Sequence, residues 1–250
     1  MRLLCLRLGM TQSQLVKRVI ALTVALIVVT PLSVIAAQWQ WNRHIERETR
    51  NNLIIQNAVA DSVPWHQIAA QGVAPETEWR TVTATGHFDV SRQKLWRKQP
   101  FNGEPGFIVI TPFITKEGDE LLVERGWVPA DGRNPAASAD LQINAQEQDI
   151  TLRIRQLTQN SEADPTDLPP GQTNSPRTMM SNKTVDGLFE LISSQTTQRL
   201  TAIPLPELEA GPHLGYVGQW IIIGLSAIGV YITVMRRLRS EYQAREIKSE

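Results

Sequence analysis

The chain has a single cysteine among its 250 residues, Cys5. The rest of the sequence can therefore form no disulfide, and it holds neither a CxxC redox or copper motif nor a CxxCH haem-attachment motif. This excludes thiol oxidoreductases and thiolate copper carriers. The sequence also lacks GxSxG, HExxH and a glycine-rich phosphate loop, and no nucleophile–base pair can be identified. We therefore expect a protein that is not an enzyme.

Acidic residues are missing from the N-terminus. The first 18 residues carry four basic side chains and no acidic one, and Arg236, Arg237 and Arg239 form a second basic cluster. The stretch 38–213 is instead acidic, with 16 Lys and Arg against 22 Asp and Glu. Because it shows no basic stripe, we expect no nucleic-acid partner.

Two uncharged apolar runs, 19–37 and 214–235, bracket this acidic stretch. A helix rises ~1.5 Å per residue and a bilayer core is ~30 Å thick, so both runs predict transmembrane helices. Basic residues flank the outer ends of both runs, which places residues 1–18 and 236–250 in the cytoplasm. A two-pass protein of the bacterial plasma (inner) membrane is predicted, with residues 38–213 outside.

A signal peptide is the alternative for the first run, because small residues close it. The run is longer than the usual apolar core of ~7–15 residues, which favours a retained helix.

The external domain shows strand patterns. Alternating or continuous apolar residues predict strands at 80–88, 93–97, 106–115, 120–129 and 149–158. The spacing of Val185, Leu188, Leu191 and Ile192 predicts an amphipathic helix over 184–196. Residues 159–177 are polar and rich in proline, so we expect an exposed, mobile loop. The predicted fold class is α+β: an antiparallel sheet of five or six strands with one or two helices.

Three stretches carry motifs that occur together. WQxxR stands just after the first apolar run, at Trp39, Gln40 and Arg43. LVERGWVP occupies 122–129, and HLxYxxxW opens the second apolar run at 213–220. In this order and spacing the sequence resembles the surfeit locus protein 1 family of cytochrome c oxidase assembly factors.

Three positions depart from the family pattern. Ala37 stands where the family usually has glycine, and Glu124 and Pro212 each stand where it usually has asparagine. Residues 159–200 match poorly, which indicates a divergent bacterial member.

The resemblance implies assistance with haem A insertion during assembly of a haem–copper oxidase. It implies haem A as a transient cofactor, and the oxidase catalytic subunit and haem A synthase as partners. The proposed iron ligand of the family corresponds to His213. The residues alone favour an interfacial histidine without a ligand, and it is the resemblance that favours the role of iron ligand.

Further haem contacts are candidates at the same depth. Tyr216 and Trp220 lie at i+3 and i+7 from His213, so they share its helix face and could cover a porphyrin. They could also be simple interfacial anchors. Arg43 could pair with haem propionates, or it could reach toward lipid headgroups.

Two rival functions remain at this point. One is a scaffold that stabilises oxidase subunits without touching haem. The other is a two-helix membrane sensor, which the short stretch after residue 235 disfavours because it is too small for an output domain.

Overall fold

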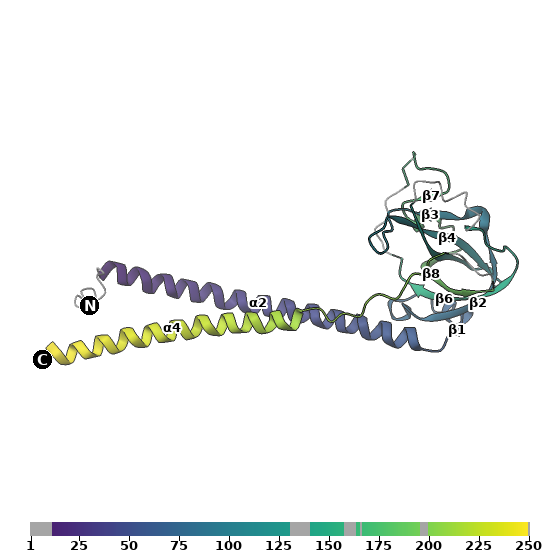
Figure 1. Cartoon of the computed structure of the whole chain (residues 1–250). Coiled ribbons are helices and arrows are strands. Elements are labelled where there is room, and N and C mark those ends of the chain that lie inside the picture. Colours follow the sequence, from purple (N-terminus) through teal and green to yellow (C-terminus); the bar gives the residue numbers. More distant parts are fainter. Residues whose placement is uncertain (1–11, 131–140, 158–163, 166, 196–199, 250) are drawn as a thin grey trace. The chain divides into compact units, whose positions relative to one another are not determined.

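The computed structural model describes residues 12–130, 141–157, 164–165, 167–195 and 200–249 (Figure 1). The chain divides into two compact units, Met1–Arg50 with Leu208–Glu250, and Asn51–Glu207. Cys5 lies outside the described residues, as do parts of the predicted N-terminal segment and of the predicted loop at 159–177.

The first unit consists of two helices, α2 (Gln12–Val59) and α4 (His213–Ser249). Both predicted membrane helices are present, and each lies in a stretch long and apolar enough to cross a bilayer, Val16–Val59 and His213–Ser240. The last turns of α2, from Asn51, belong to the second unit.

The two helices pack against each other through small and hydroxyl side chains. Ser33 is only 3 % exposed, and a Cβ atom built on Gly224 would lie 3.3 Å from the Ser33 Cβ atom. The hydroxyl oxygens of Thr23 and Tyr231 lie 3.3 Å apart. Without a hydrophobic driving force between helices in lipid, such close packing and hydrogen bonding hold a membrane hairpin together.

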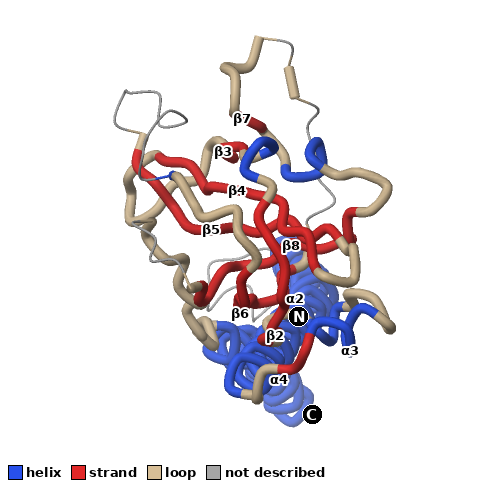
Figure 2. The backbone as a smooth tube through the Cα atoms, turned by 90° about the vertical axis from the view of Figure 1, so that its right-hand side faces the viewer, coloured by secondary structure: helices blue, strands red, loops and turns tan. Residues whose placement is uncertain are grey.

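The second unit is built on eight strands, drawn red in Figure 2. Five of them are long: β2 (Thr81–Phe88), β4 (Gly106–Thr115), β5 (Glu120–Pro129), β6 (Gln148–Arg155) and β8 (Thr184–Ser194). Three are short: β1 (Val63–Pro64), β3 (Lys94–Trp96) and β7 (Gln172–Thr173). The helix α3 (Trp65–Ala69) follows β1, and single 3₁₀ turns occupy Pro75–Thr77, Val90–Arg92 and Pro176–Met179.

The five long strands close into a barrel, because β2 pairs with both β6 and β4. The change of partner occurs at Gly86, which pairs with Gln148 on one side and Thr115 on the other. A Cβ atom at Gly86 would lie 2.0 Å from the Ile114 carbonyl oxygen, so only glycine fits here. In chain order the five barrel strands are β2, β4, β5, β6 and β8, and we number them one to five. Around the barrel they follow the order 1-2-3-5-4-1, and the third and fifth strands, β5 and β8, are parallel. This is the connectivity of an OB-fold barrel.

Two sequence-based predictions were wrong. The sheet is mixed rather than antiparallel, because β1–β2, β3–β7 and β5–β8 are parallel pairs. The predicted helix at 184–196 is the strand β8, which pairs with β5 and β6. Both faces of β8 are covered: Phe189 lies in the barrel interior and Leu188 in a second apolar cluster outside it. A strand buried on both faces loses the alternation that distinguishes it from a helix.

The barrel interior holds the main core. Its aromatic rings meet edge to face, with centroids 4.9 Å apart for Phe88 and Phe113 and 5.2 Å apart for Trp65 and Phe189. The loop expected at 159–177 is partly packed rather than exposed, since Thr173 and Ser175 are 0 % and 5 % exposed. Farther along the same segment, Met179 covers the outer face of the barrel beside Leu122 and Leu188.

Candidate functional site

His213, the first residue of α4, contacts a side chain of α2. Its Nδ1 atom lies 2.8 Å from Oε1 of Gln40, 173 residues away in the sequence. An amide oxygen can only accept a hydrogen bond, so Nδ1 of the neutral imidazole donates to it. The hydrogen bond fixes the ring orientation and leaves the lone pair of Nε2 free.

The Nε2 atom of His213 is buried and has no hydrogen-bond partner among the described residues. Leaving a buried polar atom unpaired costs about 1–3 kcal/mol. An unpaired imidazole nitrogen, on a ring oriented through its other nitrogen, is the arrangement found in metal-ligating histidines. The geometry therefore suits His213 to a ligand that accepts its lone pair.

Gly211 places the imidazole beside a cation. Its φ of +68° lies in the left-handed region, and a Cβ atom built on it would lie 3.1 Å from His213 Cδ2. The same Cβ position is 3.3 Å from Nη1 of Arg47. The guanidinium of Arg47 and the imidazole of His213 therefore both border Gly211, which any larger residue would push against them.

Arg43, the arginine that the sequence analysis favoured, has different neighbours. Arg43 Nη1 lies 2.9 Å from Oε2 of Glu46, and the guanidinium carbon is 5.8 Å from the ring centre of Trp39. Both partners of the ion pair are more than half exposed, so the pair contributes little to stability. The structure brings Gln40 and Arg47 to the His213 ring and places Arg43 beside Glu46 and Trp39.

Tyr216 and Trp220 follow His213 on α4. Tyr216 is 44 % exposed, and its backbone N–H donates to the Pro212 carbonyl in the first turn of the helix. The spacing of three and seven residues puts both rings on the same side of the helix as His213.

The sequence pattern alone assigned no role in a site to Gln40 or Arg47. A signal was present, because Arg47 lies seven residues after Gln40, two turns farther along the same helix face. Only the position of α4 shows that Gln40 and Arg47 both lie near His213.

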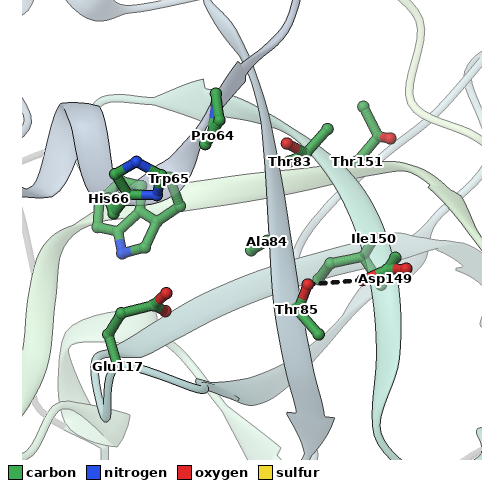
Figure 3. Close-up of a pocket in the computed structure, with 10 residues that line it drawn as sticks. All are labelled: Pro64, Trp65, His66, Thr83, Ala84, Thr85, Glu117, Asp149, Ile150 and Thr151. Atoms are coloured by element: carbon green, nitrogen blue, oxygen red, sulfur yellow. Dashed lines mark hydrogen bonds between the residues drawn. The ribbon is translucent and has the colours of Figure 1, made fainter.

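Two cavities lined by described residues of the barrel unit are candidates for a site. The larger, of about 350 Å³, is lined by Thr83 and Thr85 on β2, by β6, and by Trp65 and His66 (Figure 3). Three of its polar side chains, those of Trp65, Thr85 and Asp149, take part in hydrogen bonds. Thr85 donates to Asp149 at 2.6 Å, and the Trp65 indole N–H donates to Asp119 at 2.8 Å. No group of three or more potential metal ligands occurs among the described residues.

The second cavity, of about 220 Å³, lies on the outer face of the barrel. Its lining includes the buried carboxyl side chain of Glu124 and the guanidinium of Arg155. Burial raises the pKa of Glu124 to about 7.

Comparison with known proteins identifies the family. The model of the SURF1 family matches residues 27–225. Uncharacterized SURF1-like proteins of Mycobacterium bovis and Mycobacterium tuberculosis are each 28 % identical over 203 residues, which cover 77 % of this chain and 74 % of theirs. The cytochrome oxidase assembly protein SHY1 of Saccharomyces cerevisiae is 32 % identical over 69 residues, 27 % of this chain and 18 % of that protein. Because the family model covers the barrel and a part of each flanking helix, which is well over half of the chain, the chain belongs to the SURF1 family.

Proposed function

We propose that the protein is a non-enzymatic assembly factor for cytochrome oxidase in the bacterial plasma membrane, and that it holds haem A on its way to the catalytic subunit. Membership of the SURF1 family supports the assembly role, as does the similarity to a yeast protein named for cytochrome oxidase assembly. On this proposal both termini are cytoplasmic and the barrel faces outward, and haem A synthase is a second partner.

The observation that carries the haem proposal is the His213 ring itself. Its Nδ1 is held by Gln40 at 2.8 Å, and its Nε2 is buried without a partner. Histidine Nε2 is a common axial ligand of haem iron, and a hydrogen bond at Nδ1 both orients such a ligand and increases its basicity. These residues fit a haem as cargo.

Each neighbour of His213 has a role under this proposal. Arg47, with Arg43 as a second cation, would pair with the anionic propionates. Tyr216 and Trp220 would cover the porphyrin face. Because Nε2 is buried, the iron can reach it only when the side chains around it move aside.

A single histidine from the protein suits a carrier better than a permanent haem protein. A transfer site must release its cargo, so tight double ligation would work against the function. The side chains that cover Nε2 would also favour the empty state between deliveries.

The assembly role is tested in a strain from which the gene is deleted, with oxidase activity and haem A content measured in its membranes. We expect both to fall and to be restored by the wild-type chain but not by His213→Ala. His66→Ala, which alters an exposed histidine of the barrel, serves as the control and should restore both.

Unchanged oxidase in the deletion strain would contradict the assembly role. Full restoration by His213→Ala would contradict haem carriage and leave a scaffold role in its place.

A further inference from the structure

The cavity of about 220 Å³ occupies the face of the barrel where OB-folds bind their ligands. That face lies over the second and third strands of the ring, here β4 and β5, between the loop after the first strand and the loop after the fourth. Ile108 of β4 and Glu124 of β5 line the cavity. Trp96 of β3, in the connection from β2 to β4, and Asn174, directly after β7 in the connection from β6 to β8, close its sides.

Glu124 is the most deeply placed charged group of this cavity. It is 4 % exposed, and its carboxyl group has no hydrogen bond among the described residues. The groups that face it are Arg155 of β6 and Glu190 of β8, the latter directly opposite in the parallel register. The ion pairs that Arg155 forms are with Glu78 and Glu190.

The two arginines nearby are engaged by other carboxylates. Arg153 lies 3.1 Å from Glu190, and Arg155 lies 3.9 Å from Glu190 and 3.8 Å from Glu78. The guanidinium of Arg155 also stacks on Trp79, at 3.9 Å from the ring centre.

Arg155 also faces Glu124 and partly offsets its charge, but the two arginines are shared among three carboxylates, Glu78, Glu124 and Glu190. An ionised Glu124 gives the cluster one surplus negative charge, in a place from which water is largely removed. A buried charge of this kind is stable only with a partner, so the cluster needs one cation.

The remaining lining indicates what kind of cation fits. Asn174 Oδ1 is a second buried acceptor without a partner among the described residues. The other walls combine apolar side chains, among them Ile108, Leu188 and Ile203, with the polar side chains of Gln99, Gln156 and Arg155. Two acceptors near an apolar wall suit a group with several N–H donors on a hydrocarbon stem. At about 30 Å³ per water molecule, the cavity has room for an ammonium group and a short chain.

We propose that this cavity binds a primary ammonium group carried on a short apolar stem, with Glu124 as its counterion and Asn174 as a second acceptor. The group can come from a free alkylamine or from a lysine side chain of a partner protein. The proposal is independent of haem carriage.

The test uses the full chain in detergent and isothermal titration with n-butylammonium, with n-butanol as the uncharged control ligand. We expect the wild type to bind the amine and not the alcohol. Glu124→Gln keeps the shape and removes the charge, so it should lose at least about tenfold in affinity, the equivalent of one charge-assisted hydrogen bond. Glu104→Gln, at an exposed turn, is the matched control and should bind as the wild type does.

Binding should also depend on pH, because the amine needs ionised Glu124. Burial raises the pKa of Glu124 to about 7, so amine affinity should rise about tenfold from pH 6 to 8 and level off above. This readout needs no variant, and it holds even if Glu124→Gln folds poorly. Asn174→Leu provides a second variant that leaves the carboxylate in place and should weaken binding.

Two ligands separate the two sources of the ammonium group. Stronger binding of Nα-acetyl-lysine methylamide than of n-butylammonium would indicate a partner's lysine, and the reverse would indicate a free amine. Absence of amine binding in the wild type, or equal affinity in wild type and Glu124→Gln, would overturn the proposal.

Discussion

The Gln40 side chain holds the His213 ring across two helices, with Oε1 2.8 Å from Nδ1. One residue belongs to the WQxxR motif and the other opens the HLxYxxxW motif, so the contact joins the two motifs. This polar contact between the two helices lies next to an unpaired imidazole nitrogen.

Removing the Gln40 amide should release the ring. Gln40→Leu deletes the acceptor of the Nδ1–H bond, so His213 loses its fixed orientation. Partners of this kind typically contribute 10–100-fold to the affinity of a histidine for a metal, and we expect haem A recovered with the purified protein to fall by about that factor. Visible absorbance of the purified protein measures it.

The matched control is Gln38→Leu, an exposed glutamine two residues earlier on the same helix. Equal haem recovery from both variants would show that the Gln40 contact does not orient the ligand.

Gly211 should be intolerant of any side chain. Gly211→Ala forces a left-handed φ of +68° on alanine and places its methyl group 3.1 Å from His213 Cδ2. We expect a lower thermal unfolding midpoint and less bound haem A. Gly215→Ala, where nothing lies within 4 Å of the added atom, should be neutral or slightly stabilising because alanine favours the helix. The opposite ranking of the two variants would contradict the geometry.

The helix contact at Ser33 and Gly224 can be tested by cross-linking. A Cβ atom at Gly224 would lie 3.3 Å from the Ser33 Cβ atom, close to the ~3.5–4.5 Å typical of a disulfide. In a Cys5→Ser background, the pair Ser33→Cys and Gly224→Cys should therefore cross-link on mild oxidation, as seen by a mobility shift on non-reducing gels.

Gly229 supplies the control position for this experiment, because no atom lies within 4 Å of its built Cβ. Ser33→Cys with Gly229→Cys should stay reduced. Similar cross-linking of both pairs would mean that the helices slide freely past each other.

Glu124 should make the stability of the protein fall as pH rises. Its pKa is raised to about 7 from an ordinary 4.5, so between these values the folded carboxyl holds a proton that the unfolded one has lost. Folding then takes up a proton, and the free energy of unfolding decreases across this window by up to about 3 kcal/mol.

Glu124→Gln removes this dependence. Chemical denaturation without added amine measures the free energy of unfolding of the variant and of the wild type. The value for the variant minus the value for the wild type should increase between pH 4.5 and 8. A difference that stays constant over this range would show that the carboxyl is not buried as described. Glu104→Gln should give a flat difference.

The sequence predicted the parts of the fold that depend on local pattern. Four of its five predicted strands have close counterparts in β2, β4, β5 and β6, and the turn between 115 and 120 is present with Gly118 at a φ of +96°. The fifth, at 93–97, is the short strand β3. Alternating side chains and turn glycines carry such information within a few residues.

Pairing between distant segments could not be predicted in the same way. The parallel contact of β5 with β8 joins Val123 to Phe189, and nothing near either residue specifies the other. β8 was wrongly predicted as a helix because it contributes apolar residues to a different cluster on each of its two faces. Its sequence therefore lacks the alternation of apolar and polar residues that indicates a strand.

At the candidate site the motifs pointed to His213 but not to its partners. Arg43 was the predicted partner of haem propionates, yet Arg47 is the arginine beside Gly211 and the imidazole. A helix of the length of α2 presents several arginines, and only the position of α4 selects among them.

The central claim is that His213 holds the iron of haem A, and one spectrum tests it most directly. The full chain is co-expressed with the enzymes of haem A synthesis and purified in detergent, and its visible absorption is recorded. The account predicts a haem A band in the wild type and in His66→Ala that is lost in His213→Ala. A wild type without the band, or a band of the same size and position in His213→Ala, would contradict it.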